Sequence, residues 1–204
     1  MTTATAGTVA TGGCWPAHLE AFQRSAGFRR VPWALDLRRT GLASFRESGF
    51  PTASDEEWLY TSVEPITSNA FRQSLAPKVD ALVANHAARF TFGLSGGPRL
   101  VFVDGFYAKE LSSPEGLPEG VIAESLAAAM ESHRDLVEPR LGRIARPGST
   151  AFASLSAALF QDGAFLYVPP GRVVEPPILV LHLSHASYLA SHPRHLFVLG
   201  EGAQ

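Results

Sequence analysis

The stretch Ala158–Gly171, with the sequence ALFQDGAFLYVPPG, decides the fold class of this 204-residue chain. Its first residues end an apolar, helix-like run that begins at Phe152. Ala164–Val168 is a short aromatic and aliphatic run typical of a strand, and Pro169–Gly171 closes it with a sharp corner. The stretch therefore predicts a helix followed by a strand that ends abruptly.

The residues that follow repeat this alternation of strand and corner. Three further short runs have strand-like composition: Arg172–Glu175, Ile178–Leu183 and His195–Leu199. Most of them are too close together to leave room for the crossover helices that connect parallel strands in α/β folds. The C-terminal part is therefore predicted to be an all-β winding, and both a hairpin sandwich and a parallel β-helix fit the pattern.

The opening of the chain is predicted to be a small helical unit. Apolar residues at helical spacing predict one helix from about Pro16 to Phe28. A second, weaker stripe runs through Leu35–Phe45 and is stopped by Gly49–Pro51. Gly41 lies inside that second helix, where glycine has poor helix propensity.

The middle of the chain is strand-like in composition rather than helical. Phe90–Phe92 and Leu100–Val103 are strand-like runs on either side of a glycine-rich segment, which predicts a hairpin. A further strand at Val121–Ala123 leads to Ser125, whose hydroxyl can cap a short helix.

We therefore predict an α+β chain with a boundary near Ile144–Ser149, where proline and glycine interrupt the pattern. Residues 1–14 are expected to be a disordered tail, residues 15–148 a helical and α/β domain, and residues 149–204 the start of the β winding.

Composition argues against nucleic-acid and membrane partners and against secretion. A formal net charge of -2 provides no general attraction to nucleic acid or to an anionic membrane. The N-terminus lacks the features of a secretory signal, no apolar run is long enough for a membrane helix, and the single Cys14 rules out an intrachain disulfide. We expect a soluble cytoplasmic protein. The arginines of the opening are expected to form a solvated helix face: Arg24, Arg29, Arg30, Arg38, Arg39 and Arg46.

Motifs that resemble catalytic sites lack the context that their chemistry needs. Gly93–Gly97 matches G-x-S-x-G, but a proline and another strand follow where a nucleophile elbow requires a helix. The same glycines lack the Gly-Lys-Ser/Thr of a phosphate loop. We therefore predict no catalytic residue and no nucleotide site in this chain.

Four histidines form the only group rich in metal-ligand types: His182, His185, His192 and His195. On a strand, His182 and His185 point to opposite faces and cannot chelate one ion together. Surface and loop positions are the expectation for all four, with no metal site. One cysteine also cannot supply the four thiolates of an iron-sulfur cluster.

Two long stretches carry a family resemblance. Gly49–Thr52 with Asp55–Thr61 resembles the G-F-P-T-x-x-D-E-E-W-K-Y-T signature of SufD proteins, with Leu59 at a position that is usually Lys or Arg. Ala158–Gly171, followed by the proline-rich corner and the last strand, is similar to the entry of the β-helix core of SufB and SufD. The resemblance covers about residues 15–204.

The resemblance implies a non-catalytic scaffold subunit of the SUF iron-sulfur cluster assembly complex. It implies an N-terminal helical and α/β domain followed by the first coils of a right-handed parallel β-helix, truncated at the C-terminus. It further implies pairing with SufB and with the ABC-type ATPase SufC, and a cluster that is handled by the complex, with no cofactor bound by this chain. Within the motif, Trp58 and Tyr60 are expected to anchor the core behind a helix start capped by Ser54.

Two alternatives remain at this point. SufB shares the core fold, and only the Trp58 motif favours SufD. The alternative from another class is a cupin-like metal-binding β-barrel enzyme, because Tyr167–Gly171 resembles the entry to a cupin metal motif. That motif needs a His-x-His shortly after the glycine, and Arg172–Leu181 contains no histidine.

Overall fold

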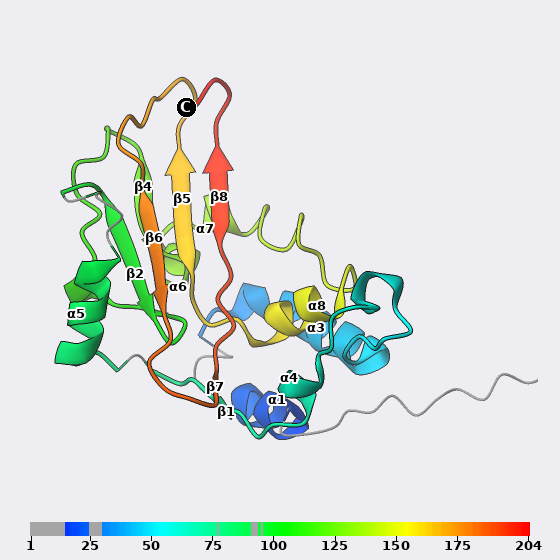
Figure 1. Ribbon diagram of the computed structural model, residues 1–204. Coiled ribbons are helices and arrows are strands. Elements are labelled where there is room, and N and C mark those ends of the chain that lie inside the picture. Colours follow the sequence, from blue (N-terminus) through cyan, green and yellow to red (C-terminus); the bar gives the residue numbers. More distant parts are fainter. Residues whose placement is uncertain (1–14, 25–29, 77, 91–93, 95) are drawn as a thin grey trace, which may run out of the picture.

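The computed structural model describes residues 15–24, 30–76, 78–90, 94 and 96–204. Within them, α1, α3, α4 and α8 gather on one side, and two short sheets with α5, α6 and α7 lie on the other; α8 leads directly into β5 (Figure 1). The predicted tail 1–14 lies outside the described residues.

The helical body is built on α3 (Leu35–Ser48) and α8 (Ala151–Leu159), which pack against each other, with α1 (Trp15–Arg24) beside α8. The second predicted helix is thus confirmed, and Gly49 ends it with a positive φ of 66°. Gly41 is explained by packing, because a Cβ there would lie 2.7 Å from the Ala158 nitrogen and 2.8 Å from the Ser154 oxygen. Close approach of the two helices requires this glycine.

Two three-stranded sheets hold the rest of the chain. The first has the order β3 (Phe106–Tyr107), β2 (Arg99–Val103), β6 (Leu179–Leu183), with β2 and β6 parallel. The second has the order β4 (Ile122–Ser125), β5 (Ala164–Val168), β8 (Leu196–Leu199), with β5 and β8 parallel. A short pair, β1 (Arg72–Gln73) and β7 (Leu189–Ala190), lies between the sheets and the helices in Figure 1.

The two sheets share a buried apolar layer. Leu100 and Phe102 of β2 pack with Ala123 of β4 and Ala164 of β5. Helix α5 (Ala81–Arg89) covers the other side of the first sheet, and α6 (Leu126–Ser132) with α7 (Arg134–Val137) covers the other side of the second. Short helical turns complete the chain: η1 (Pro32–Ala34), η2 (Glu56–Trp58), α4 (Glu64–Thr67) and η3 (Lys109–Leu111).

The chain winds from β5 through β6 and returns to lie beside β5 as β8. Phe165 faces Leu196 and Val168 faces Leu199, so the paired residues are 31 positions apart in the sequence. Hydrogen bonds continue beyond the strands, since the Gly171 N–H donates to the Glu201 oxygen and the Val174 N–H to the Gln204 oxygen. The chain from β8 onward therefore stacks on the chain from β5 onward in a constant register.

Local predictions in the second sheet are confirmed. β5 has the predicted bounds, and the Ser125 hydroxyl caps α6 by accepting a hydrogen bond from the Ala128 N–H at 3.2 Å. The strand predicted at Arg172–Glu175 is wrong, because these residues form the corner between β5 and β6.

The predicted hairpin of the middle segment is not what the described residues form. The segment before the glycines is helix α5, which ends at Arg89 and was not predicted from the sequence. The predicted strand at Leu100–Val103 lies in β2, which pairs with β3 and β6. Residues 91–93 of the predicted first arm lie outside the described residues.

Pairing also crosses the predicted domain boundary at residues 148 and 149. β2 pairs with β6, β4 pairs with β5, and α3 packs on α8. The boundary stays a prediction, but each side supplies partners to the other. The described strands form open sheets rather than one closed barrel, which removes support from the cupin-like alternative.

Candidate functional site

Each of the two three-stranded sheets has an edge strand from the C-terminal part of the chain, β6 in the first sheet and β8 in the second. Phe197 is 53% exposed and Leu199 is 67% exposed, and neither strand contains a charged residue. In a parallel pair, alternate residues bond to the neighbouring strand, so the Gly200 bond to the Val168 oxygen leaves the Phe197 and Leu199 peptide groups on the outer side. Such an edge can pair with a further strand.

Two of the four histidines contact each other beside these edge strands, His182 on β6 and His195 just before β8. The rings of His182 and His195 are 4.9 Å apart and tilted by 66°, and His182 stacks on the buried Phe102 at 4.9 Å. His182 and Phe102 are register partners on β6 and β2, so the stack follows directly from strand pairing. The sequence did not predict this contact, because His182 lies on β6 and His195 lies just before β8, 13 residues later.

The backbone determines the tautomer of His195. Its Nδ1 accepts a hydrogen bond from the Ala164 N–H at 2.9 Å, so the proton of the neutral ring lies on Nε2. Burial lowers the pKa of His195, and the nearby Asp162 opposes that shift. Burial, with a smaller effect of His195, lowers the pKa of His182 to about 4. Both rings are therefore neutral at pH 7.

This arrangement does not favour a metal ion. A histidine that ligates through one nitrogen normally donates a hydrogen from the other, whereas the Nδ1 of His195 accepts one. Within the described ranges, no three His, Cys, Asp or Glu side chains gather as a metal site would require. The absence of a metal site stays a prediction.

The other two histidines lie apart from this pair. The Nε2 of His185 is 3.6 Å from an Asp80 carboxylate oxygen, next to α5. Burial, with a smaller effect of His18, lowers the pKa of His192 to about 4. Burial also lowers the pKa of His18, which a hydrogen bond with the Phe71 backbone partly offsets. His182 and His185 thus have separate partners, and the expectation that they do not chelate one ion together stays a prediction.

A buried carboxylate that sequence reasoning missed connects three segments. Asp162 Oδ1 accepts hydrogen bonds from the Ser125 hydroxyl at 2.7 Å and from the Ala127 and Gly163 N–H groups, and Oδ2 accepts one from the Tyr107 N–H at 2.9 Å. Asp162 also lines an open cavity of about 1160 Å³. Its position just before β5 was visible in the sequence, but its partners are far away along the chain.

The Trp58 motif is located differently from the prediction. Trp58 is only half-buried and contacts the ring of Phe152 at 5.3 Å, while Tyr60 is 95% exposed. Ser54 does not cap the turn; Asp55 accepts a hydrogen bond from the Thr52 N–H at 2.6 Å instead. The prediction that Trp58 and Tyr60 anchor the core is therefore wrong, because the acidic run forms a single 3₁₀ turn on a surface loop.

Four of the six arginines of the opening have structural partners. Arg38 is 1% exposed, lies over the rings of Phe22 and Phe160, and donates a hydrogen bond to the Phe160 carbonyl oxygen. Burial lowers its pKa to about 10. Three others form ion pairs with acidic residues: Arg24 with Glu20, Arg30 with Glu131 and Arg39 with Asp36. The prediction of a solvated face is wrong for Arg38, which is part of the core.

Some predicted features fall outside the described residues: Cys14, Arg29 and the serine of the G-x-S-x-G match, Ser95. Within the described part of the chain, no helix combines the length and apolar character that crossing a membrane requires.

Comparison with known proteins identifies the family. A family model described as the SufBD protein N-terminal region matches residues 30–180. The chain belongs to the SufBD family. The match includes Gly49–Thr61 and Ala158–Gly171, and it contains β2, β4 and β5 in full and the start of β6.

Curated relatives agree with this family. An iron-sulfur cluster assembly SufBD family protein of Synechocystis sp. is 27% identical over 170 residues, which cover 82% of this chain and 37% of the relative. A chloroplastic iron-sulfur cluster assembly SufBD family protein of Arabidopsis thaliana is 32% identical over 84 residues, covering 41% of this chain and 15% of the relative. One from Porphyra purpurea is 41% identical over 54 residues, covering 26% and 11%. The chain thus spans little more than a third of the length of the Synechocystis SufBD protein.

Proposed function

We propose that this chain is the N-terminal part of a SufD-type scaffold subunit of the SUF iron-sulfur cluster assembly machinery, without catalytic activity of its own. The family match over residues 30–180, with relatives named as iron-sulfur cluster assembly proteins, carries the proposal. The choice of SufD over SufB rests on the resemblance of Gly49–Thr61 to the SufD signature. We place the protein in the cytoplasm.

We further propose that β5 and β6 belong to the first coil of a right-handed parallel β-helix and that β8 begins the second coil. The 31-residue spacing of the β5–β8 pair supports this, because successive coils of such a fold stack in constant register. The exposed apolar side chains of Phe197 and Leu199 support it too, since a following coil would cover them.

The proposed partners are SufB and the ATPase SufC. With one cysteine, this chain cannot supply four thiolates, so the cluster would be held by ligands from the complex. The edge strands β6 and β8 contain no charged residue, which suits a scaffold subunit that forms backbone hydrogen bonds with strands of its partners.

Co-expression tests the scaffold role. The tagged chain would be produced with a SufB-type subunit and a SufC-type ATPase, and we expect the SufB-type subunit to co-purify with it in stoichiometric amount. Association of the two partners with each other but not with the chain would refute the role.

Anaerobic reconstitution tests the absence of a cofactor. With iron and sulfide, the isolated chain should develop no stoichiometric visible absorbance, and Cys14→Ser should leave the spectrum unchanged. A defined cluster that survives the Cys14→Ser substitution would contradict the proposal.

A further inference from the structure

The Trp58 motif lies in a strongly acidic segment that the scaffold role does not explain. Residues 47–71 contain five acidic residues and no Lys, Arg or His, although the whole chain has a net charge of only -2. The five are Glu47, Asp55, Glu56, Glu57 and Glu64. Among the described residues, none of these five carboxylates forms an ion pair. The segment therefore presents an uncompensated negative charge.

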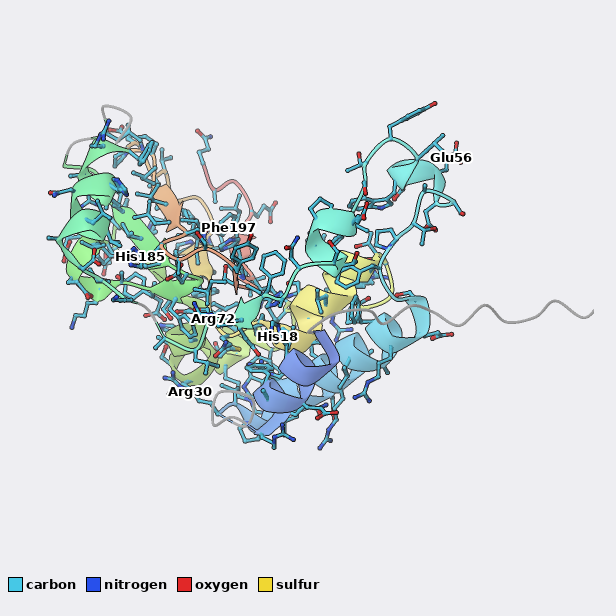
Figure 2. All side chains as sticks on the ribbon, turned by 60° about the horizontal axis from the view of Figure 1, so that its bottom comes forward. His18, Arg30, Glu56, Arg72, His185 and Phe197 are labelled. Atoms are coloured by element: carbon cyan, nitrogen blue, oxygen red, sulfur yellow. The ribbon has the colours of Figure 1, made fainter. Side chains whose placement is uncertain are left out.

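The segment projects from the helical body. Figure 2 shows the part around Glu56 standing away from α3 and α8. Its first half contacts that body through Phe50, which packs edge-on against Phe45 at 5.0 Å, and through Trp58 on Phe152. Ile66 and Phe71 anchor its second half against the same core. At the projecting end, Glu56, Glu57 and Tyr60 are exposed and accessible to another molecule.

Apolar side chains accompany the charge at the projecting end. Leu59 is 51% exposed and Tyr60 is 95% exposed. Together with Pro51, Trp58 and Val63 they line an open hollow of about 480 Å³. Tyrosine and tryptophan beside a hollow are the residue types that dominate protein recognition, because they contribute large contact area at low entropic cost.

We propose that residues 47–71 form a docking surface for a basic peptide segment of a partner protein, with an apolar side chain of that segment entering the hollow beside Tyr60. The five carboxylates select lysine and arginine, and the hollow selects the apolar residue between them. Nucleic acid and anionic membranes are repelled by the same charge.

The charge also predicts how docking responds to salt. The carboxylates are exposed, so their attraction for a basic segment is screened within about 8 Å at physiological ionic strength. The apolar contact at the hollow does not weaken with salt in this way. Binding should therefore weaken, without vanishing, as the ionic strength rises.

Three synthetic 12-residue peptides test the proposal by fluorescence anisotropy with the full chain. The first alternates Lys and Leu, the second replaces each Leu with Ser, and the third replaces each Lys with Glu. We expect the Lys-Leu peptide to bind at least tenfold more tightly than the Lys-Ser peptide, and the Glu-Leu peptide not to bind. Equal binding of the two basic peptides, or no binding of either, would overturn the proposal.

Variants locate the binding surface. Tyr60→Ala and Glu57→Lys should each weaken binding of the Lys-Leu peptide about tenfold without changing the melting temperature, because both side chains are exposed. Matched controls carry the same changes elsewhere: Leu82→Ala removes an exposed apolar side chain of α5, and Glu110→Lys reverses an exposed charge in η3. If the controls weaken binding as much as the test variants, the attraction is general and the docking surface is refuted.

Discussion

Gly41 offers the sharpest test of the packing between α3 and α8. Alanine has a helix propensity about 1 kcal/mol better than glycine, so propensity alone predicts that Gly41→Ala stabilises the protein. The structure predicts the opposite. A Cβ at position 41 would lie 2.7 Å from the Ala158 nitrogen, 2.8 Å from the Ser154 oxygen and 2.9 Å from the Ala157 Cβ.

Two of these three atoms belong to the α8 backbone and cannot move by a change of rotamer. The helices must separate, and overpacking of this kind costs about 1 to 3 kcal/mol. We expect the upper end of that range, because α8 also leads directly into β5. After subtraction of the propensity gain, Gly41→Ala should destabilise the protein by about 2 kcal/mol, or about 4 to 8 °C in melting temperature.

Urea denaturation followed by circular dichroism at 222 nm measures the change, with Ala43→Gly as the matched control. Ala43 is exposed in the same helix, so its substitution reports propensity alone and should cost about 1 kcal/mol. A Gly41→Ala protein that is as stable as the parent, or more stable, would refute the close packing of the two helices.

Three further predictions concern other parts of the molecule. Burial lowers the pKa of His18, His182, His192 and His195, so below pH 6.5 the folded protein binds fewer protons than the unfolded chain. The free energy of unfolding should therefore be constant just above about pH 6.5 and should fall as the pH drops towards about 4. A melting temperature that does not change across this window would contradict the histidine environments. Asp162→Asn should destabilise by about 2 to 4 kcal/mol, because an amide cannot accept all the hydrogen bonds that the carboxylate accepts; the exposed Asp135→Asn is the control, and equal melting curves for the two variants would show that the network is dispensable. Trp58→Ala should cost about 1 to 2 kcal/mol and Tyr60→Ala less than about 0.5 kcal/mol in thermal denaturation, since Trp58 is half-buried and Tyr60 exposed; a loss above about 3 kcal/mol for either would restore the core-anchor interpretation.

Features governed by neighbours in the chain were predictable from the sequence. The end of α3 at Gly49 follows from the rarity of positive φ in other residues, and the Ser125 cap follows from the free N–H groups at a helix start. The bounds of β5 follow from a run of strand formers ended by two prolines. In each case the responsible interaction spans only a few residues.

The tertiary structure alone decided which distant segments meet. The pairing of β2 with β6 joins residues 80 positions apart, Arg99 with Leu179, and it brings His182 onto Phe102. The burial of Arg38 depends on Phe22 and Phe160 converging on it, and no local pattern distinguishes it from the ion-paired Arg39 one residue later. Secondary structure is set largely by local sterics and hydrogen bonding, whereas register and burial depend on the packing of the whole chain. For this reason even the correctly predicted strands, such as β5, left the histidine contacts and the exposed Trp58 motif undetermined.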